Sequence, residues 1–281
     1  MMKRNQLREA IFRHLDGLVV VPVAYSLFKK GILAHLLKEK STTLSQITNE
    51  FHANEGYLNV ALRVLASQGF LKYEVDNVSG NVTITSLPIS EFAFSLVPMY
   101  EDTFHLLTQS SVFTANKMDV DSIALLEPIL KKFTENYHIH FEEDEHLRAI
   151  QEQMLTHIEG YLVGPIVVNL GMTGMFHKYF MESSFRADEF HKHPEAFAKI
   201  LDFFVHLGWF SKKNDNYQFT EDGFFFAKRA SAYGVTVSYL PMFKHIDNLL
   251  FGNASELRNI AKNEDEIHVN REMNVWGSGG A

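Results

Sequence analysis

The stretch His14-Leu15-Asp16-Gly17-Leu18-Val19-Val20-Val21-Pro22, followed by Gly31, returns later in the chain as His157-Ile158-Glu159-Gly160-Tyr161-Leu162-Val163-Gly164-Pro165, followed by Gly174. The histidine, the two glycines and the proline of the first stretch each precede their counterparts by 143 positions (157 − 14). An ordered match of this kind, with apolar residues between the shared positions, indicates an internal duplication. We therefore interpret the chain as two copies of one unit.

The match continues along the chain with small changes of register, which we expect to fall in loops. At an offset of 139, the pairs are Leu62, Leu65, Gly69 and Phe70 with Leu201, Phe204, Gly208 and Trp209. At an offset of 135, Asn81–Thr85 pairs with Asn216–Thr220. At 143 again, Pro98-Met99-Tyr100 pairs with Pro241-Met242-Phe243.

Each copy has the local pattern of a run of helices followed by a β-hairpin. In the first copy, apolar spacing predicts helices at 7–28, 33–38, 44–51 and 55–68, the last with Asn54 as its N-cap. Strands are predicted at 71–75 and 82–85, around a turn that contains Gly80. The second copy repeats this order at 185–190, 194–207, 210–212 and 217–220. Helices followed by a hairpin predict a winged helix.

The predicted fold class is mainly α with small β-wings, built as tandem winged-helix units joined by a helical linker. We place the first unit at 1–118, the linker at 119–150, the second unit at 151–253, and a C-terminal helix and tail at 254–281. The linker is polar and charge-dense, with helices expected around Ser122–Asn136 and Asp144–Met154. A further helix is expected at Ala254–Asn263, before a tail that ends in the glycine cluster Gly277–Gly280.

Composition narrows the possible functions. The 281-residue chain carries a net charge of −8, which argues against a sequence-independent nucleic-acid binder. It contains no cysteine, so disulfides, zinc–thiolate sites and thiol nucleophiles are excluded, as suits a cytoplasmic protein. The apolar run Leu18–Leu27 is interpreted as a buried helix, and no apolar stretch is expected to be long enough to span a membrane.

The charge around the predicted wings also disfavours DNA binding. A winged helix that reads DNA places its third helix in the major groove and contacts phosphates with cations. The third helix has Arg63 against Glu55 in the first copy, and Lys199 against Glu195 and Asp202 in the second. Only the second wing offers a basic pair, Lys212-Lys213.

The residues Pro22–Leu33, Leu44–Phe51 and Leu58–Phe70 resemble the N-terminal winged-helix domain of class I S-adenosylmethionine-dependent small-molecule methyltransferases of the O-methyltransferase type. In the second copy, Phe219-Thr220-Glu221-Asp222-Gly223 is similar to the segment that closes the wing in that family. The resemblance implies a homodimer, a substrate-recognition role and a small-molecule substrate. It makes the first helix of each unit a dimerisation helix.

This chain departs from the family in one major respect. The family binds S-adenosylmethionine on a doubly wound α/β domain, through a glycine-rich turn between a strand and a helix. The glycine cluster Gly277–Gly280 has no predicted strand before it, and we interpret it as a linker or an artificial chain end. We therefore expect the chain to be the N-terminal part of a longer enzyme, with the cofactor bound by the missing C-terminal catalytic domain and none by this chain alone.

Candidate substrate-binding residues lie where the resemblance places the substrate-facing helix. Met and aromatic side chains form an adaptable apolar wall, and a histidine beside a carboxylate can orient or deprotonate a hydroxyl group. These residues are Tyr239, Met242, Phe243, His245 and Asp247. Trp276 joins them, because a tryptophan in a polar tail has to dock on something, for which the catalytic domain is the candidate. Core packing is the alternative interpretation for the five residues between 239 and 247.

Other histidines receive structural interpretations. His14 and His157 occupy equivalent positions, and a repeated histidine on an apolar helix is more typical of a structural hydrogen bonder than of a catalyst. His138, His140 and His146 lie beside the acidic run Glu142–Glu145, without a recognisable metal motif. A solvated helix start is expected there, and no metal.

The sequence thus predicts the dimerisation and substrate-recognition part of a methyltransferase, inactive by itself. The alternative is a free-standing tandem winged-helix module that binds a protein, DNA or an apolar ligand.

Overall fold

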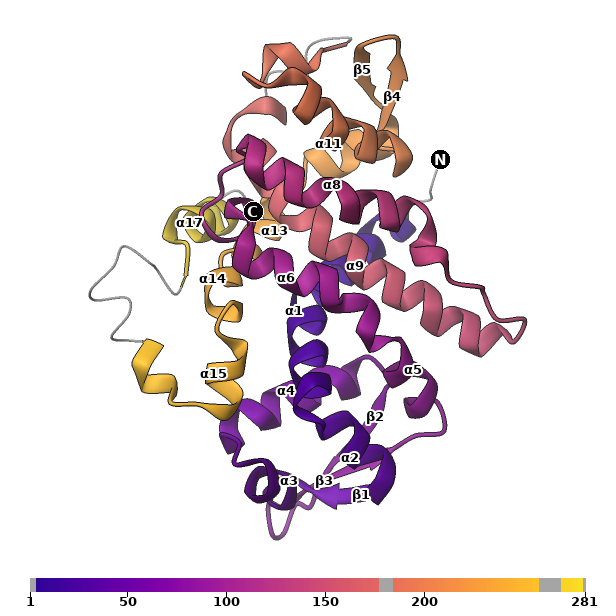
Figure 1. Ribbon diagram of the computed structural model, residues 1–281, viewed down its shortest axis with the longest axis vertical. Helices are drawn as coiled ribbons and strands as arrows, with labels where there is room; N and C mark the ends of the chain where they lie inside the picture. The colour runs from indigo at the N-terminus through magenta and orange to yellow at the C-terminus, as the bar shows by residue number, and fades with distance from the viewer. Residues whose placement is uncertain (1–3, 177–183, 258–268, 280–281) are drawn as a thin grey trace.

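The computed structural model describes residues 4–176, 184–257 and 269–279 (Figure 1). Two long helices, α1 (Arg4–Lys30) and α9 (Glu145–Met172), cross in the middle of the molecule, and a winged-helix unit lies at each end. The described elements are mainly helical, with two small antiparallel sheets. The predicted fold class is confirmed.

The first unit follows the predicted order closely. After α1 come α2 (Ile32–Glu39), β1 (Ser41–Thr43), α3 (Leu44–Phe51), α4 (Glu55–Ser67), β2 (Leu71–Val75) and β3 (Val82–Ser86). The side chain of Asn54 caps α4 by accepting from the Tyr57 amide, and Gly69 leaves the helix at a φ of 78°. The three strands form a sheet in the order β1-β3-β2.

The second unit differs from its prediction at one element. It contains α11 (Pro194–His206), β4 (Phe210–Lys213) and β5 (Asn216–Phe219) as expected. The helix predicted at 185–190 is wrong, because Phe185 makes a β-bridge to Tyr217 and only a short 3₁₀ turn, η3 (Ala187–Glu189), follows. Phe185 stands 143 positions after Thr42 of β1, so the bridge is what remains of that strand.

The strand register corrects the predicted alignment of the wings. Leu71 pairs with Ser86 in the first hairpin and Phe210 pairs with Phe219 in the second, so Ser86 corresponds to Phe219 at an offset of 133 (219 − 86). The offset of 135 is therefore wrong by two residues. The reason is the second turn, which contains only Asn214 and Asp215 between its strands, and Asn214 adopts the positive φ that such short turns require.

The linker contributes to the hydrophobic core. After α5 (Ser90–Leu96), η1 (Val97–Tyr100), α6 (Glu101–Gln109) and α7 (Ser111–Thr114), the helix α8 (Val120–Thr134) lies across α11. It buries Ile123, Leu126 and Phe133, and the turn η2 (Asn136–His138) follows. The second predicted linker helix is the first part of α9, so the boundary placed between residues 150 and 151 falls inside a continuous helix.

The C-terminal part of the chain folds back onto the crossing. It comprises α12 (Glu221–Ala227), α13 (Ser231–Val237), α14 (Leu240–Phe243), α15 (Ile246–Phe251) and α17 (Arg271–Gly279). Residues 254–257 are helical, and the rest of the helix expected at 254–263 lies outside the described residues. A Cβ on Gly234 would lie 2.8 Å from the Cα of Gly277, so α13 and α17 touch backbone to backbone. The interpretation of this glycine cluster as a linker is wrong for residues 277–279.

Within the described residues, α1 is long and apolar enough to cross a membrane by length and composition. This corrects the expectation that no stretch reaches that length. In the most apolar part of α1, however, 67% of the residues are buried against the rest of the molecule.

Candidate functional site

The repeated glycines allow α1 and α9 to meet at their backbones. A Cβ on Gly17 would lie 2.2 Å from the carbonyl oxygen of His157, and a Cβ on Gly160 would lie 2.4 Å from the carbonyl oxygen of His14. These distances leave no room for a side chain, so both positions require glycine. Gly17 and Gly160 therefore each lie on the histidine of the other copy.

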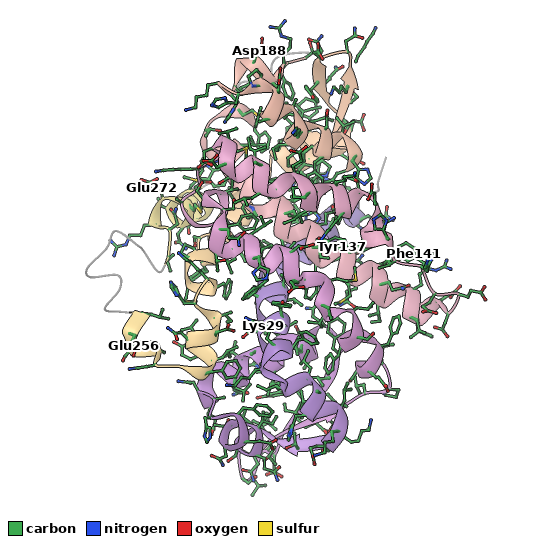
Figure 2. The ribbon with its side chains drawn as sticks, in the orientation of Figure 1. Lys29, Tyr137, Phe141, Asp188, Glu256 and Glu272 are labelled. Carbon is green, nitrogen blue, oxygen red and sulfur yellow. The ribbon has the colours of Figure 1, made fainter. Side chains whose placement is uncertain are left out.

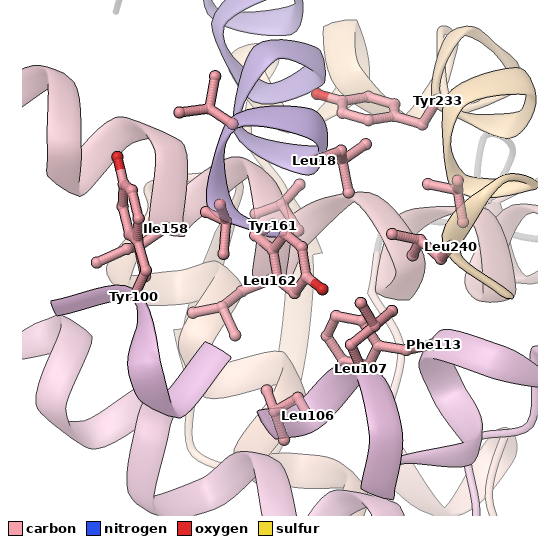
Figure 3. Close-up of a cluster of buried hydrophobic side chains, with 14 of the residues drawn as sticks. Leu18, Tyr100, Leu106, Leu107, Phe113, Ile158, Tyr161, Leu162, Tyr233 and Leu240 are labelled. Carbon is pink, nitrogen blue, oxygen red and sulfur yellow. The ribbon is translucent and has the colours of Figure 1, made fainter. Parts of the chain in front are cut away.

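The side chain of each histidine also bonds to a tyrosine of the other copy, so the two copies exchange contacts here as well. The Nδ1 atom of His14 lies 2.7 Å from the hydroxyl of Tyr233, and that of His157 lies 2.7 Å from the hydroxyl of Tyr100. Figure 3 shows the two tyrosines on opposite sides of α1. All four side chains are buried, as expected for structural hydrogen bonders.

This exchange identifies Tyr233 as the counterpart of Tyr100, at the offset of 133 already found in the wings. The predicted pairing of Tyr100 with Phe243 is wrong. The local Pro-Met-aromatic motif occurs in both copies, but Phe243 lies at the end of α14, after α13 has already supplied the equivalent tyrosine.

The Nε2 atoms of the two histidines have different hydrogen-bond partners. The Nε2 atom of His14 lies 3.1 Å from a carboxylate oxygen of Glu159, whereas that of His157 lies 3.0 Å from the amide oxygen of Gln68. Asp16 is the counterpart of Glu159 by the offset of 143, and it bonds to the side chain of Gln68. In the second copy, Leu207 stands in the position of Gln68. The Gln68 amide therefore lies between His157 and Asp16, whereas His14 contacts Glu159 directly.

Protonation follows from these surroundings. Burial lowers the pKa of His157 to about 3, so its ring is neutral at pH 7. We therefore assign the Nε2 proton as donated to Gln68, with Nδ1 accepting from the Tyr100 hydroxyl. Asp16 is exposed at the surface. Partial desolvation raises its pKa, and the hydrogen bond with Gln68 lowers it by a smaller amount.

Two pockets flank the crossing and are equivalent under the duplication. The polar pocket, about 510 Å³, is lined by Arg13, Asp16, Ser67, Gln68, Ala149, Glu152, Gln153, Thr156 and His157. The aromatic pocket, about 390 Å³, is lined by Gln6, Glu9, Ala10, Arg13, His14, Thr156, Glu159, Leu207, Trp209, Asp222 and Phe226. In the aromatic pocket, Trp209 and Phe226 stack with centroids 4.0 Å apart. Both pockets can hold a small molecule through hydrogen bonds, and they differ in how apolar that molecule should be.

The predicted substrate-binding residues differ in their exposure and in their contacts. Tyr239 is exposed, and Met242, Phe243 and His245 are half-buried around α14. Asp247 is held by α1, because its carboxylate accepts from the Ser26 hydroxyl at 2.5 Å and from Lys29 at 2.9 Å. Lys29, labelled in Figure 2, lies near the C-terminal end of α1.

Trp276 has a partner within the chain. A Cβ on Gly171 would lie 2.7 Å from the Trp276 ring, so the indole packs directly on α9. Trp276 belongs to α17 and is half-buried. The expectation that Trp276 lies in a polar tail and docks on another domain is therefore wrong.

Two further expectations concern metal ions and DNA. In the part of the chain that the structure describes, no group of three or more His, Asp or Glu residues comes together as metal ligands. The third helix of the first unit, α4, exposes Tyr57 and Val60. Two of the cations of the second unit are paired: Lys199 lies 2.5 Å from Glu127, and Lys212 lies 2.7 Å from Asp202.

Four members of the site were not predicted from the sequence: Gln68, Glu159, Tyr100 and Tyr233. The tyrosines could be found by carrying the offset of 133 from the wing hairpin onward, but that offset depends on the strand pairing. For Gln68 there was no signal, because its counterpart Leu207 is apolar.

The architecture defines a tandem winged-helix protein whose two copies are joined through a helix crossing. Residues 159–253 match the family model described as the AprA winged helix domain, and residues 7–73 match the one described as the AprA N-terminal domain. The chain thus carries AprA-related N-terminal and winged-helix domains. No curated protein matches it.

Proposed function

We propose that this chain is the non-catalytic, substrate-recognition region of an S-adenosylmethionine-dependent methyltransferase that acts on a small molecule. The observation that carries the proposal is the use of both winged-helix units for packing: the crossing of α1 and α9 makes them one framework with pockets on both sides. Methyl transfer depends strongly on how the acceptor is positioned, which a rigid framework of this kind can supply.

The described residues do not fit S-adenosylmethionine in the manner of the family. Their strands form only antiparallel wings. The glycines with positive φ end helices or lie in a wing turn, at Gly31, Gly69, Gly80, Gly174 and Gly208, and none of them joins a parallel strand to a helix. We therefore propose that another domain of a longer protein binds the donor.

The proposed acceptor wall comprises Tyr239, Met242 and Phe243, which remain partly open to solvent. Asp247 is bonded to Ser26 and Lys29 of α1, and Trp276 packs on α9. His245 lies between α14 and α15 and completes the proposed set.

The resemblance also implies a homodimer. Because α1 and α9 bury their repeated faces against each other within one chain, a homodimer would have to use another surface. Its test is the molar mass measured by light scattering over a range of concentrations.

DNA binding is the weaker alternative, since α4 exposes apolar side chains and two cations of the second unit, Lys199 and Lys212, are paired with carboxylates. An apolar-ligand module remains the second candidate, which the aromatic pocket favours.

Steady-state kinetics of the whole gene product test the proposal. Tyr239→Ala and Met242→Ala should raise KM for the acceptor and leave KM for S-adenosylmethionine unchanged. Val78→Ala, at a wing position that is 98% exposed, is the matched control. Equal effects on both KM values, or none on either, would argue against acceptor recognition by this wall.

A further inference from the structure

A separate pocket of about 430 Å³ lies at the C-terminal end of α9, beside the second unit. Its floor is apolar, formed in part by Leu170, Met175 and Phe197, each of which is at most 3% exposed. Its rim carries the exposed side chains of Lys117 and Lys192. An apolar floor with a few polar groups at its edge is the usual composition of a small-molecule site.

The walls of this pocket are fixed by hydrogen bonds between distant parts of the chain. The side-chain amide of Asn169, on α9, donates to the carbonyl oxygen of Asn116 at 2.7 Å. The Nε2 atom of His191 lies 2.8 Å from the carbonyl oxygen of Met118. The loop 116–119 is thus tied on both sides, and Asn116 adopts a φ of 51°, which asparagine tolerates better than most residues.

The charge of the pocket is positive, in contrast to the net charge of −8 of the chain. Within the described residues, neither Lys117 nor Lys192 forms an ion pair within 4.0 Å. Asp119 is the one carboxylate among the lining residues. Hydrogen bonds from the Ser111 hydroxyl and the Ser122 amide lower its pKa, and the charge of Lys117 lowers it further, so this carboxylate stays ionised. Two ammonium groups against one ionised carboxylate leave an excess of positive charge in the lining, which favours an anion.

We propose that this pocket binds a small organic acid, with its apolar body on the floor and its carboxylate at Lys117 and Lys192. The proposal does not depend on methyl transfer. It concerns residues of this chain alone, so it can be tested on the chain without an acceptor or a methyl donor.

Three probes with the same eight-carbon body separate the contributions of charge and apolar contact: octanoate, octanol and octylamine. In calorimetric titrations, octanoate should bind with saturation at one site, octanol at least about fivefold more weakly, and octylamine not at all. Failure of octanoate to saturate would overturn the proposal. Equal affinity for octanoate and octanol would also overturn it, since the lysines would then contribute nothing.

The double variant Lys117→Gln/Lys192→Gln tests whether binding occurs at this place. It should weaken octanoate at least about fivefold and leave octanol unchanged. Lys131→Gln, an exposed position near the far end of α8, is the control and should bind octanoate as the wild type does. Octanoate binding that survives the double variant would place the acid elsewhere and refute the assignment. All of these lysines are exposed, so folding should be retained, and matching melting temperatures will check this.

Discussion

Gly17 of α1 packs directly on the backbone of His157 of α9, and the duplication repeats this contact between Gly160 and His14. The relationship is the one found at a two-fold interface, where a residue meets its partner's counterpart and the reverse contact also occurs. Here both halves of the interface belong to one chain. The crossing therefore joins the units in the way that identical subunits of a dimer would be joined.

Replacing Gly17 by alanine should destabilise the protein. The added Cβ would overlap the His157 carbonyl, and forcing atoms into a packed contact costs about 1–3 kcal/mol. Urea unfolding followed by circular dichroism measures this loss. Gly56→Ala is the matched control, because its nearest neighbour would be 3.5 Å away and alanine favours the helix α4. Equal stability of Gly17→Ala and wild type would contradict the close crossing.

The stability of the wild type should fall with pH below about 6.5. An unfolded histidine has a pKa near 6.5, whereas His157 in the folded protein has a pKa of about 3. Between these values the unfolded chain binds the extra proton, so this residue removes up to about 1.4 kcal/mol of stability for each pH unit of acidification. Urea midpoints at pH 7, 6 and 5 give the slope, which His157→Gln should reduce.

Tyr100→Phe is the control for that experiment. It removes the hydrogen bond between the Tyr100 hydroxyl and His157 but keeps the histidine ring that titrates. The variant should therefore be less stable at pH 7 and retain the pH dependence of the wild type. A His157→Gln variant with the slope of the wild type would show that another group dominates this pH range.

Asp247 should stabilise the protein through its hydrogen bond with Ser26. A double-mutant cycle of Asp247→Asn and Ser26→Ala should give a coupling energy of about 0.5–2 kcal/mol, because the buried Ser26 hydroxyl donates to this carboxylate. Unfolding free energies of the four proteins measure the coupling. Additive effects of the two substitutions would mean that the contact contributes nothing.

Trp276→Ala should release α17 from α9. The indole lies against Gly171, and its loss removes this contact with α9, while α13 still packs on α17 through Gly234 and Gly277. Limited proteolysis should cut the variant near residues 271–279 faster than the wild type. Val275→Ala, on the same helix and at a position that is 70% exposed, should be cut at the wild-type rate. Identical digestion of all three proteins would indicate that α17 is held by other contacts.

The sequence revealed the duplication because its markers are local. Glycine, proline and histidine at a fixed spacing survive in both copies, and apolar periodicity predicted α3 and β2 at their observed bounds. What could not be predicted depends on contacts between distant segments. The β-bridge of Phe185, the pairing of Tyr233 with His14 and the packing of Trp276 on α9 each require the folded chain. Local similarity also misled, since Pro241-Met242-Phe243 repeats a motif without occupying the equivalent place.

Equilibrium titration with S-adenosylmethionine shows which part of the protein binds the methyl donor. Residues 1–281 alone and the product of the whole gene would be titrated side by side by calorimetry, up to about 1 mM, the upper end of ordinary substrate affinities. The proposal of a recognition region beside a separate donor-binding domain predicts saturable binding by the whole product and none by residues 1–281. Saturable one-to-one binding by residues 1–281, or no binding by the whole product, would contradict it.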